Sequence, residues 1–196
     1  MFEFLINNWL EALSTVIGIW CVWLLIKENV LTFPLGIMYS ITAVVVLVQV
    51  NLYADVVLNL AYIAMNAYGW YYWLYGGGER READQLTVAT TSPLLVWQLL
   101  AVTLVGALAM GWLFDNYSAA DLAYLDSLTT FASFVAMWMT AQKYLSSWVA
   151  WFIIDVIQIG LYSYKGLYFY AFLFFVYLVL AVLGWRAWRK HLREPA

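Results

Sequence analysis

The sequence YFYAFLFFVYLVLAVLGWRA, residues Tyr168–Ala187, is apolar almost throughout and carries a single charge, Arg186, close to its end. A helix needs about 20 mostly apolar residues to cross the hydrocarbon core of a bilayer. This stretch therefore predicts a membrane-spanning helix. Six more stretches meet the same requirement: Trp9–Ile26, Val30–Val48, Ala54–Tyr75, Leu94–Phe114, Leu122–Ala141 and Trp148–Tyr164.

The composition of the chain also favours a membrane protein. Hydrophobic residues make up 66% of its 196 residues and charged residues 11%, whereas a soluble domain is ~45–50% apolar and ~25% charged. Lipid must therefore act as part of the solvent. A net charge of -3 without a basic patch argues against a nucleic-acid partner. Cys21 is the single cysteine and builds no disulfide framework, and His191 is expected to be solvated in the charged tail.

The basic residues are distributed unevenly over the loops. Seven spans put the two ends of the chain on opposite sides of the membrane. If the N-terminus is outside, the outer side receives only Lys165 among the nine lysines and arginines. Cytoplasmic loops carry the excess of positive charge, so we expect the N-terminus outside and the C-terminus in the cytoplasm. No lysine or arginine accompanies Glu3 at the start, so no cleavable signal is expected.

The chain is similar to itself at an offset of 115 residues. The motif GWYYW (69–73) recurs as GWRAW (184–188), and LY at 52–53 recurs at 167–168. No gap is needed over the match, which is typical of repeat architectures; chance in a chain rich in leucine and tryptophan is the alternative. The tryptophans of the two motifs lie next to arginines and are interpreted as anchors at the membrane interface.

Each repeat holds three helices, and one further span lies between them. That span reverses the chain once more, so the repeats are expected to be parallel. We predict an all-α polytopic membrane protein with seven transmembrane helices, a 3+1+3 parallel repeat (SWEET-like), and a site between the halves near the midplane. The predicted divisions are 1–75 for the first repeat, 76–120 for a flexible cytoplasmic loop plus the linker helix, and 121–196 for the second repeat and the cytoplasmic tail.

One motif in the sixth predicted span carries chemistry: Trp148-x-x-Trp151-x-x-x-Asp155. Its three side chains share one face of a helix. A carboxylate at membrane depth costs several kcal/mol unless it faces protein, water or a partner charge, and no lysine or arginine of a neighbouring span lies at matching depth. A cationic ligand would supply that partner, and each indole face would add ~0.5–2 kcal/mol. The alternative is a structural aspartate bonded to another helix, with the tryptophans in the interfacial belt.

Other polar residues within the spans are further candidates for substrate binding. Each could equally be a contact between helices, because Asn, Gln, Ser and Thr often hold membrane helices together. They are Asn66, Gln158, Asn59, Tyr39 and Thr130. No residue set for catalysis, metal binding or nucleotide binding is found, so we expect neither an enzyme nor a bound cofactor.

Three segments resemble the Pnu family of vitamin transporters. They are LYADVVLNLAYIAMNAYGWYYW (52–73), LDSLTTFASFVAMWMTAQKYLSSWVAWFIIDV (125–156) and GWRAW (184–188), within a resemblance that extends from about Trp9 to Trp188. The resemblance implies a homotrimer in the bacterial inner membrane. It also implies facilitated diffusion of a vitamin, made one-way by phosphorylation in the cytoplasm. It assigns Trp148, Trp151, Asp155 and Asn66 to the binding site.

The last residue of the tryptophan motif separates two branches of that family. The PnuC branch, which carries nicotinamide riboside, has Asn there, whereas Asp155 of this chain resembles the thiamin branch, PnuT. Both ligands carry a cationic ring. A carboxylate suits a protonated aminopyrimidine, whereas a neutral Asn suits a carboxamide. The sequence therefore predicts a thiamin transporter, with a nicotinamide riboside transporter as the alternative and a non-transporting membrane scaffold as a third possibility.

Overall fold

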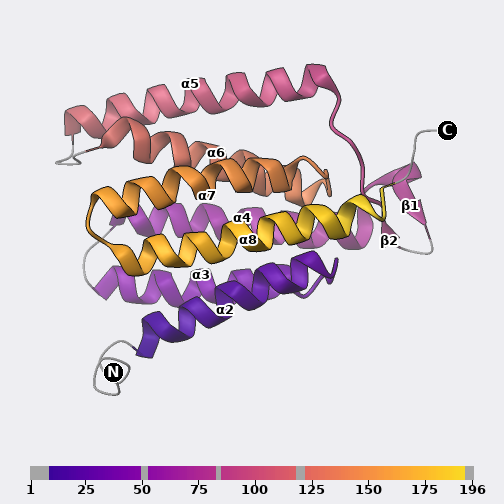
Figure 1. Ribbon diagram of the computed structural model, residues 1–196, viewed down its shortest axis with the longest axis horizontal. Coiled ribbons are helices and arrows are strands. Elements are labelled where there is room, and N and C mark those ends of the chain that lie inside the picture. Colours follow the sequence, from indigo (N-terminus) through magenta and orange to yellow (C-terminus); the bar gives the residue numbers. More distant parts are fainter. Residues whose placement is uncertain (1–8, 50–52, 83–84, 118–121, 193–196) are drawn as a thin grey trace. The chain divides into compact units, whose positions relative to one another are not determined.

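The structure is a computed structural model that describes residues 9–49, 53–82, 85–117 and 122–192 (Figure 1). These residues contain seven α-helices: α2 Trp9–Ile26, α3 Thr32–Gln49, α4 Tyr53–Tyr75, α5 Pro93–Tyr117, α6 Ala123–Ala141, α7 Ser147–Tyr164 and α8 Tyr168–Arg189. The seven predicted helices are confirmed, with ends that differ from the predicted ones by at most three residues. Pro34 lies in the first turn of α3, where proline is tolerated.

Two of the described helices, α5 and α8, are long and apolar enough by length and composition alone to cross a membrane. The others carry more polar side chains or have shorter apolar stretches. In α4, for example, Asp55, Asn59 and Asn66 lower the mean hydropathy. That each of the seven helices crosses the membrane therefore stays a prediction.

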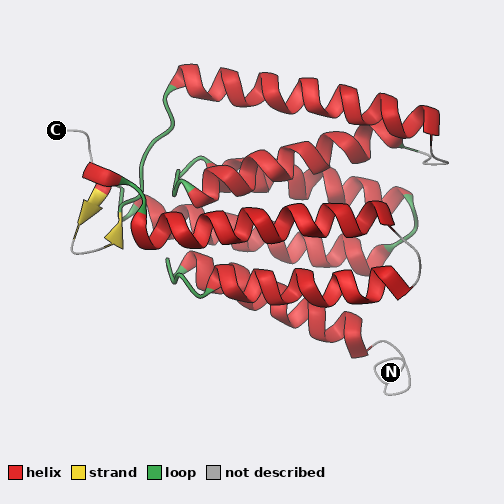
Figure 2. Ribbon diagram, turned by 180° about the vertical axis from the view of Figure 1, so that it is seen from behind, coloured by secondary structure: helices red, strands yellow, loops and turns green. Residues whose placement is uncertain are grey.

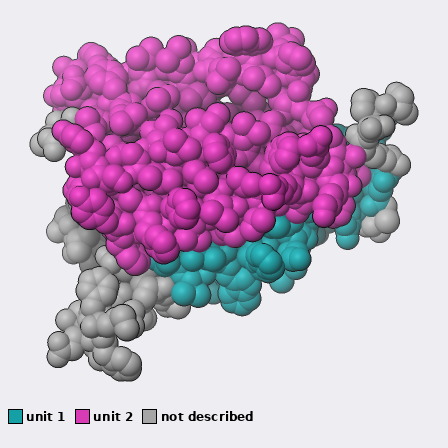
Figure 3. Space-filling view, in the orientation of Figure 1, with its two compact units in different colours: residues 1–86 teal, residues 87–196 magenta. Residues whose placement is uncertain are grey.

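The chain divides into two compact units, Met1–Leu86 and Thr87–Ala196 (Figure 3). In unit 1, α3 packs against both α2 and α4. In unit 2, α5 lies along α6, α6 packs on α7, and α7 packs on α8 (Figure 1). The linker helix α5 thus shares a unit with the second three-helix repeat.

The polar segment after α4 is more ordered than the expected flexible loop. It forms a single 3₁₀ turn, Gly78–Arg80, and two short antiparallel strands, β1 Arg81–Glu82 and β2 Gln85–Leu86, drawn as arrows in Figure 2. Arg81 donates from Nη1 to the carbonyl oxygens of Trp73 and Gly76, at 3.2 Å each, and so caps the end of α4. The sequence pattern missed this cap because it depends on one side chain folding back onto the helix end.

Two pairs of helices begin at the predicted offset. Helices α3 and α7 begin 115 residues apart, and so do α4 and α8. The turn before α3 and the turn before α7 each contain a non-glycine residue with left-handed backbone, Glu28 at φ 55° and Lys143 at φ 57°. Those two residues are also 115 apart. The parallel arrangement of the repeats about an axis along the membrane normal stays a prediction.

An aromatic packing motif also recurs in each repeat. In unit 1, Phe33 meets Trp73 edge to face, with ring centroids 5.0 Å apart and planes at 84°. In unit 2, Trp148 meets Trp188 at 5.3 Å and 86°. The first ring of each pair lies over a glycine, Gly69 or Gly184, where a Cβ would overlap it.

This packing corrects the interpretation of the GWxxW tryptophans as interfacial anchors. Trp73 is 6% exposed and Trp188 is fully buried, so both are core residues of their repeats. Only the first tryptophan of each motif has the exposure of an anchor. Trp70 is exposed, and Trp185 is half-buried beneath the Arg189 guanidinium, which lies 4.9 Å from its ring centroid.

Candidate substrate site on helix α7

Asp155 lies in the middle of α7, in the second repeat. The residue is 4% exposed. Among the residues that the structure describes, its side chain makes no hydrogen bond or ion pair. An ionised carboxylate with neither water nor a partner is strongly unfavourable, so native proteins rarely retain one without a function. The alternative of a structural aspartate bonded to a neighbouring helix finds no support within the described part of the chain.

Two contacts fix the register between α6 and α7. Near one end of the helix pair, Trp151 Nε1 donates to Thr140 Oγ1 at 3.0 Å. At the other end, Lys165 Nζ donates to both carboxylate oxygens of Asp126, at 3.2 and 3.3 Å. The two helices run antiparallel, so steps back along α6 match steps forward along α7. Alternating steps of four and three residues, each about one helical turn, lead from Trp151 to Lys165 along α7 and from Thr140 to Asp126 along α6. The same register therefore holds over the whole interface.

This register shows why α6 leaves Asp155 without a partner. One turn from the Thr140–Trp151 contact it places Ala136 opposite Asp155, and Ala136 has no side-chain donor. The polar residues nearby on α6 bond to their own helix: Ser133 Oγ donates to the Thr129 carbonyl oxygen at 2.7 Å, and Thr140 Oγ1 to that of Ala136 at 2.8 Å. The stripe of polar side chains on α6 is therefore interrupted at the level of the carboxylate.

Gln158 lies one turn beyond Asp155 on the same face of α7. Its amide oxygen Oε1 is buried and has no hydrogen-bond partner in the described structure. Asp155 and Gln158 thus present two unpaired acceptors close together. A ligand with a positive charge and N–H donors complements that pair. Thr130, on α6, is half-buried, and no contact of its side chain adds to this group.

Trp151 and Trp148 differ in their surroundings. The Trp151 indole is half-buried and is held through its N–H, which leaves its ring faces as the part able to meet a ligand. Trp148 is 2% exposed and packs on Gly184 and Trp188, as Phe33 packs in the first repeat. That packing favours a structural role for Trp148, and its assignment to the binding site stays a prediction.

The three candidates in unit 1 also differ from one another. Asn66, on α4, is 7% exposed; its Nδ2 donates to the Tyr62 carbonyl oxygen at 2.9 Å, and its Oδ1 fills the space over Gly36 of α3. Asn59 is half-buried and has a partner, and Tyr39 is 40% exposed. Asn66 thus serves at least as a contact between α3 and α4. A substrate role for these three residues stays a prediction.

Two residues of unit 2 were missed by sequence reasoning. Thr140 Oγ1 accepts the Trp151 N–H, and the register inferred from the two contacts between α6 and α7 sets Ala136 at the level of Asp155. A threonine near a helix end and an alanine inside an apolar run carry no distinctive pattern. Only the fixed register of the α6–α7 pair reveals them. No cluster of potential metal ligands is present among the described residues.

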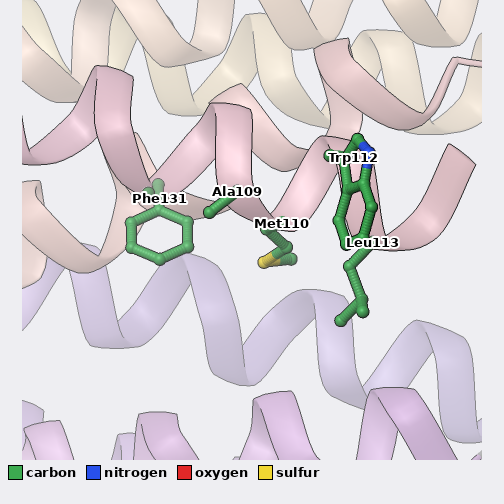
Figure 4. A pocket seen from close by; sticks show the side chains of 6 residues that line it. Ala109, Met110, Trp112, Leu113 and Phe131 are labelled. Atoms are coloured by element: carbon green, nitrogen blue, oxygen red, sulfur yellow. The ribbon is translucent and has the colours of Figure 1, made fainter.

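An open groove lies between α5 and α6, with a volume of about 510 Å³ (Figure 4). Phe131 of α6 lines it together with residues of α5. The α5 residues are Gly106, Ala109, Met110, Trp112 and Leu113. The lining is apolar and includes none of the predicted site residues, so it lacks the groups that would orient a polar vitamin.

The chain is similar to known transporters. The family description "Nicotinamide mononucleotide transporter" matches residues 8–190. The chain is 23% identical to the nicotinamide riboside transporter PnuC of Escherichia coli K12, over 95% of this chain and 87% of that protein. It is 27% identical to the riboflavin/roseoflavin transporter RibM of Streptomyces davaonensis, over 64% and 59% of the two chains.

A solved structure shares the fold. The crystal structure of the vitamin B3 transporter PnuC superposes with a TM-score of 0.73 at 21% identity, covering 96% of this chain and 84% of that one. The resemblance inferred from the three sequence segments is thereby confirmed. The chain belongs to the nicotinamide mononucleotide transporter family, which makes it a PnuC-type vitamin transporter and a multi-pass protein of the bacterial inner membrane.

Proposed function

We propose that the chain carries a small vitamin with a cationic aromatic ring by facilitated diffusion, and that Asp155 and Trp151 bind the ring. The observation that carries the proposal is the buried carboxylate of Asp155, which makes no hydrogen bond or ion pair among the described residues. A bound cation supplies the missing partner. The half-buried indole of Trp151, one turn away on the same face, supplies a surface for stacking.

Nicotinamide riboside is the first candidate substrate. The E. coli relative, which matches nearly the whole chain, is named for it. Its pyridinium ring satisfies the charge requirement of Asp155, and its carboxamide N–H groups suit the unpaired Oε1 of Gln158. The relatives therefore favour the alternative of the sequence analysis over thiamin.

Thiamin is the second candidate, and one residue favours it. By the family resemblance, PnuC proteins have Asn at the position of Asp155. A carboxylate accepts two charge-assisted hydrogen bonds from a protonated aminopyrimidine, and such bonds are about twice as strong as neutral ones. The name of RibM is a further indication that substrates differ between relatives of similar identity.

Binding calorimetry on the purified protein separates the two candidates. Nicotinamide riboside and thiamin are titrated separately, with riboflavin as a third ligand. Tight binding of one cationic ligand identifies the substrate. Binding of riboflavin alone contradicts the proposal, because riboflavin is neutral and gives Asp155 no counter-charge.

Uptake into proteoliposomes tests the transport mechanism. Labelled ligand is supplied without ATP and without an ion gradient, and its internal concentration is expected to rise only to the external one. Accumulation above that level would show coupling to an energy source. Binding without flux would support the scaffold alternative. The homotrimer, the outward N-terminus and the trapping by phosphorylation stay predictions from the resemblance and the charge pattern.

A further inference from the structure

We propose that Thr140 is a positioning residue that holds the Trp151 indole in the orientation that stacks on the substrate. This inference rests on the proposed function. Thr140, near the end of α6, is 4% exposed, and its Oγ1 accepts the Trp151 N–H at 3.0 Å. The bond connects a residue outside the binding face to the aromatic ring of that face.

In this contact Trp151 is the hydrogen-bond donor and Thr140 is the acceptor. The Thr140 hydroxyl donates its proton to the Ala136 carbonyl oxygen at 2.8 Å. The same oxygen accepts the indole N–H of Trp151. An indole N–H with an acceptor is more stable than one without, so these two bonds favour one rotation of the Trp151 indole about its side-chain torsions.

The first repeat indicates that the fold does not need this hydrogen bond, called here the Thr140–Trp151 tie. At the equivalent positions, 115 residues earlier, stand Leu25 and Gly36, which cannot form such a bond. Helices α2 and α3 nevertheless pack against each other. The Thr140–Trp151 bond is thus a feature of the repeat that contains Asp155.

The tie has a consequence for recognition. With its N–H occupied, Trp151 offers a ligand its ring face and no hydrogen-bond donor. Holding a ring in its binding orientation reduces the side-chain entropy lost on binding. Loss of the Thr140 hydroxyl should therefore weaken binding without removing any direct contact to the ligand.

Thr140→Val removes the hydroxyl and preserves the shape of the side chain. We expect the dissociation constant of the cationic ligand, measured by calorimetry, to rise about threefold to tenfold, which is the value of one net hydrogen bond. Thr140→Ser keeps the hydroxyl and should restore binding. Thr129→Val is the matched control, because Thr129 is also buried on α6 but donates only to carbonyl oxygens of its own helix. Its dissociation constant should stay within about twofold of the parent.

Repeating the Thr140→Val substitution in a Trp151→Phe variant distinguishes a positioning role of Thr140 from a role in packing α6 against α7. In Trp151→Phe the ring remains and the N–H is absent, so Thr140→Val should have no further effect there. An equal loss of affinity in both backgrounds would overturn the proposal, as would a failure of Thr140→Ser to restore binding.

A spectroscopic readout keeps the test independent of the ligand. In the proton NMR spectrum, the indole N–H resonance of Trp151 is assigned by its loss in Trp151→Phe. Removal of its acceptor in Thr140→Val should move that resonance upfield, and Thr129→Val should leave it in place. An unchanged resonance in Thr140→Val would refute the tie even if no ligand binds. If instead the resonance shifts and neither cationic ligand binds, the tie exists but its proposed role in recognition fails together with the proposed function.

Discussion

Trp148 packs edge to face on Trp188 over Gly184, with ring centroids 5.3 Å apart. The pair repeats the contact that Phe33 makes with Trp73 over Gly69 in the first unit. Two repeats of one chain thus use the same glycine gap to bring α7 onto α8 and α3 onto α4. The gap has to stay open for both helix pairs to pack.

Gly184→Ala is therefore expected to destabilise the protein, because the added Cβ would overlap the Trp148 ring. Overpacking of this kind costs about 1–3 kcal/mol. Thermal unfolding in detergent, followed by near-ultraviolet circular dichroism, measures the loss. Gly160→Ala is the control, because it lies in α7 with nothing within 4 Å of the added Cβ. That variant should be as stable as the parent or more so, since alanine favours helix over glycine by about 1 kcal/mol. Equal melting temperatures for the two variants would argue against the gap.

Trp148→Phe tests whether Trp148 binds the ligand or packs the repeat. The first repeat already has phenylalanine at the equivalent position, and the Trp148 Nε1 is buried with no hydrogen-bond partner in the described structure. The substitution should therefore leave the folded state intact and change the ligand dissociation constant by less than about twofold. Calorimetry with the transported ligand measures it. A loss of affinity of tenfold or more in a stable variant would return Trp148 to the binding site.

Asp155→Asn removes the charge and keeps the shape. Because a charge-assisted bond contributes about 1.5–3 kcal/mol, thiamin should bind roughly tenfold more weakly or worse. Nicotinamide riboside should lose less affinity than thiamin, because its pyridinium ring loses the attraction to the carboxylate but an Asn amide can still bond to its carboxamide. The pair of dissociation constants, compared with those of the parent, is the measurement. Equal thiamin affinity in parent and variant would remove Asp155 from the site.

The sequence predicted the helices well because their lengths are set by bilayer thickness and their ends by turn residues. It also singled out Asp155 as a candidate, because a charged residue in an apolar run is conspicuous; the role of Asp155 in binding stays a prediction. It assigned both Trp148 and Trp151 to the site, since both lie on the helix face of Asp155. Their neighbours on other helices differ: Trp148 contacts Gly184 and Trp188 of α8, and Trp151 contacts Thr140 of α6. Such contacts depend on helix register, which a single sequence does not specify.

The Asp126–Lys165 pair is expected to contribute little to stability. Both side chains are partly exposed, at 38% and 33%, so solvent screens their attraction. A double-mutant cycle with Asp126→Asn and Lys165→Met should give a coupling energy of about 0.2–1 kcal/mol. The coupling energy is obtained from the unfolding midpoints of the parent, the two single variants and the double variant. Ligand binding should be unchanged, because the pair lies at the end of the α6–α7 interface far from Trp151. A coupling above about 2 kcal/mol would show that the pair is desolvated in the membrane-embedded protein.

Ala136→Ser tests whether ligand binding depends on the absence of a hydrogen-bond donor at position 136, opposite Asp155. The α6–α7 register places residue 136 against the carboxylate, and Ala136 is fully buried there. A serine hydroxyl that donates to Asp155 instead of to the Ala132 carbonyl oxygen of its own helix would give the carboxylate a hydrogen-bond partner within the protein. The ligand would then have to displace that bond, so its dissociation constant should rise about threefold to tenfold while the protein becomes no less stable. Ala141→Ser, at a fully buried alanine at the end of the same helix, is the control for adding a hydroxyl to α6. Calorimetry and thermal unfolding of both variants decide the matter. If Ala136→Ser binds the ligand as the parent does, the absence of a side-chain donor at position 136 does not contribute to ligand binding.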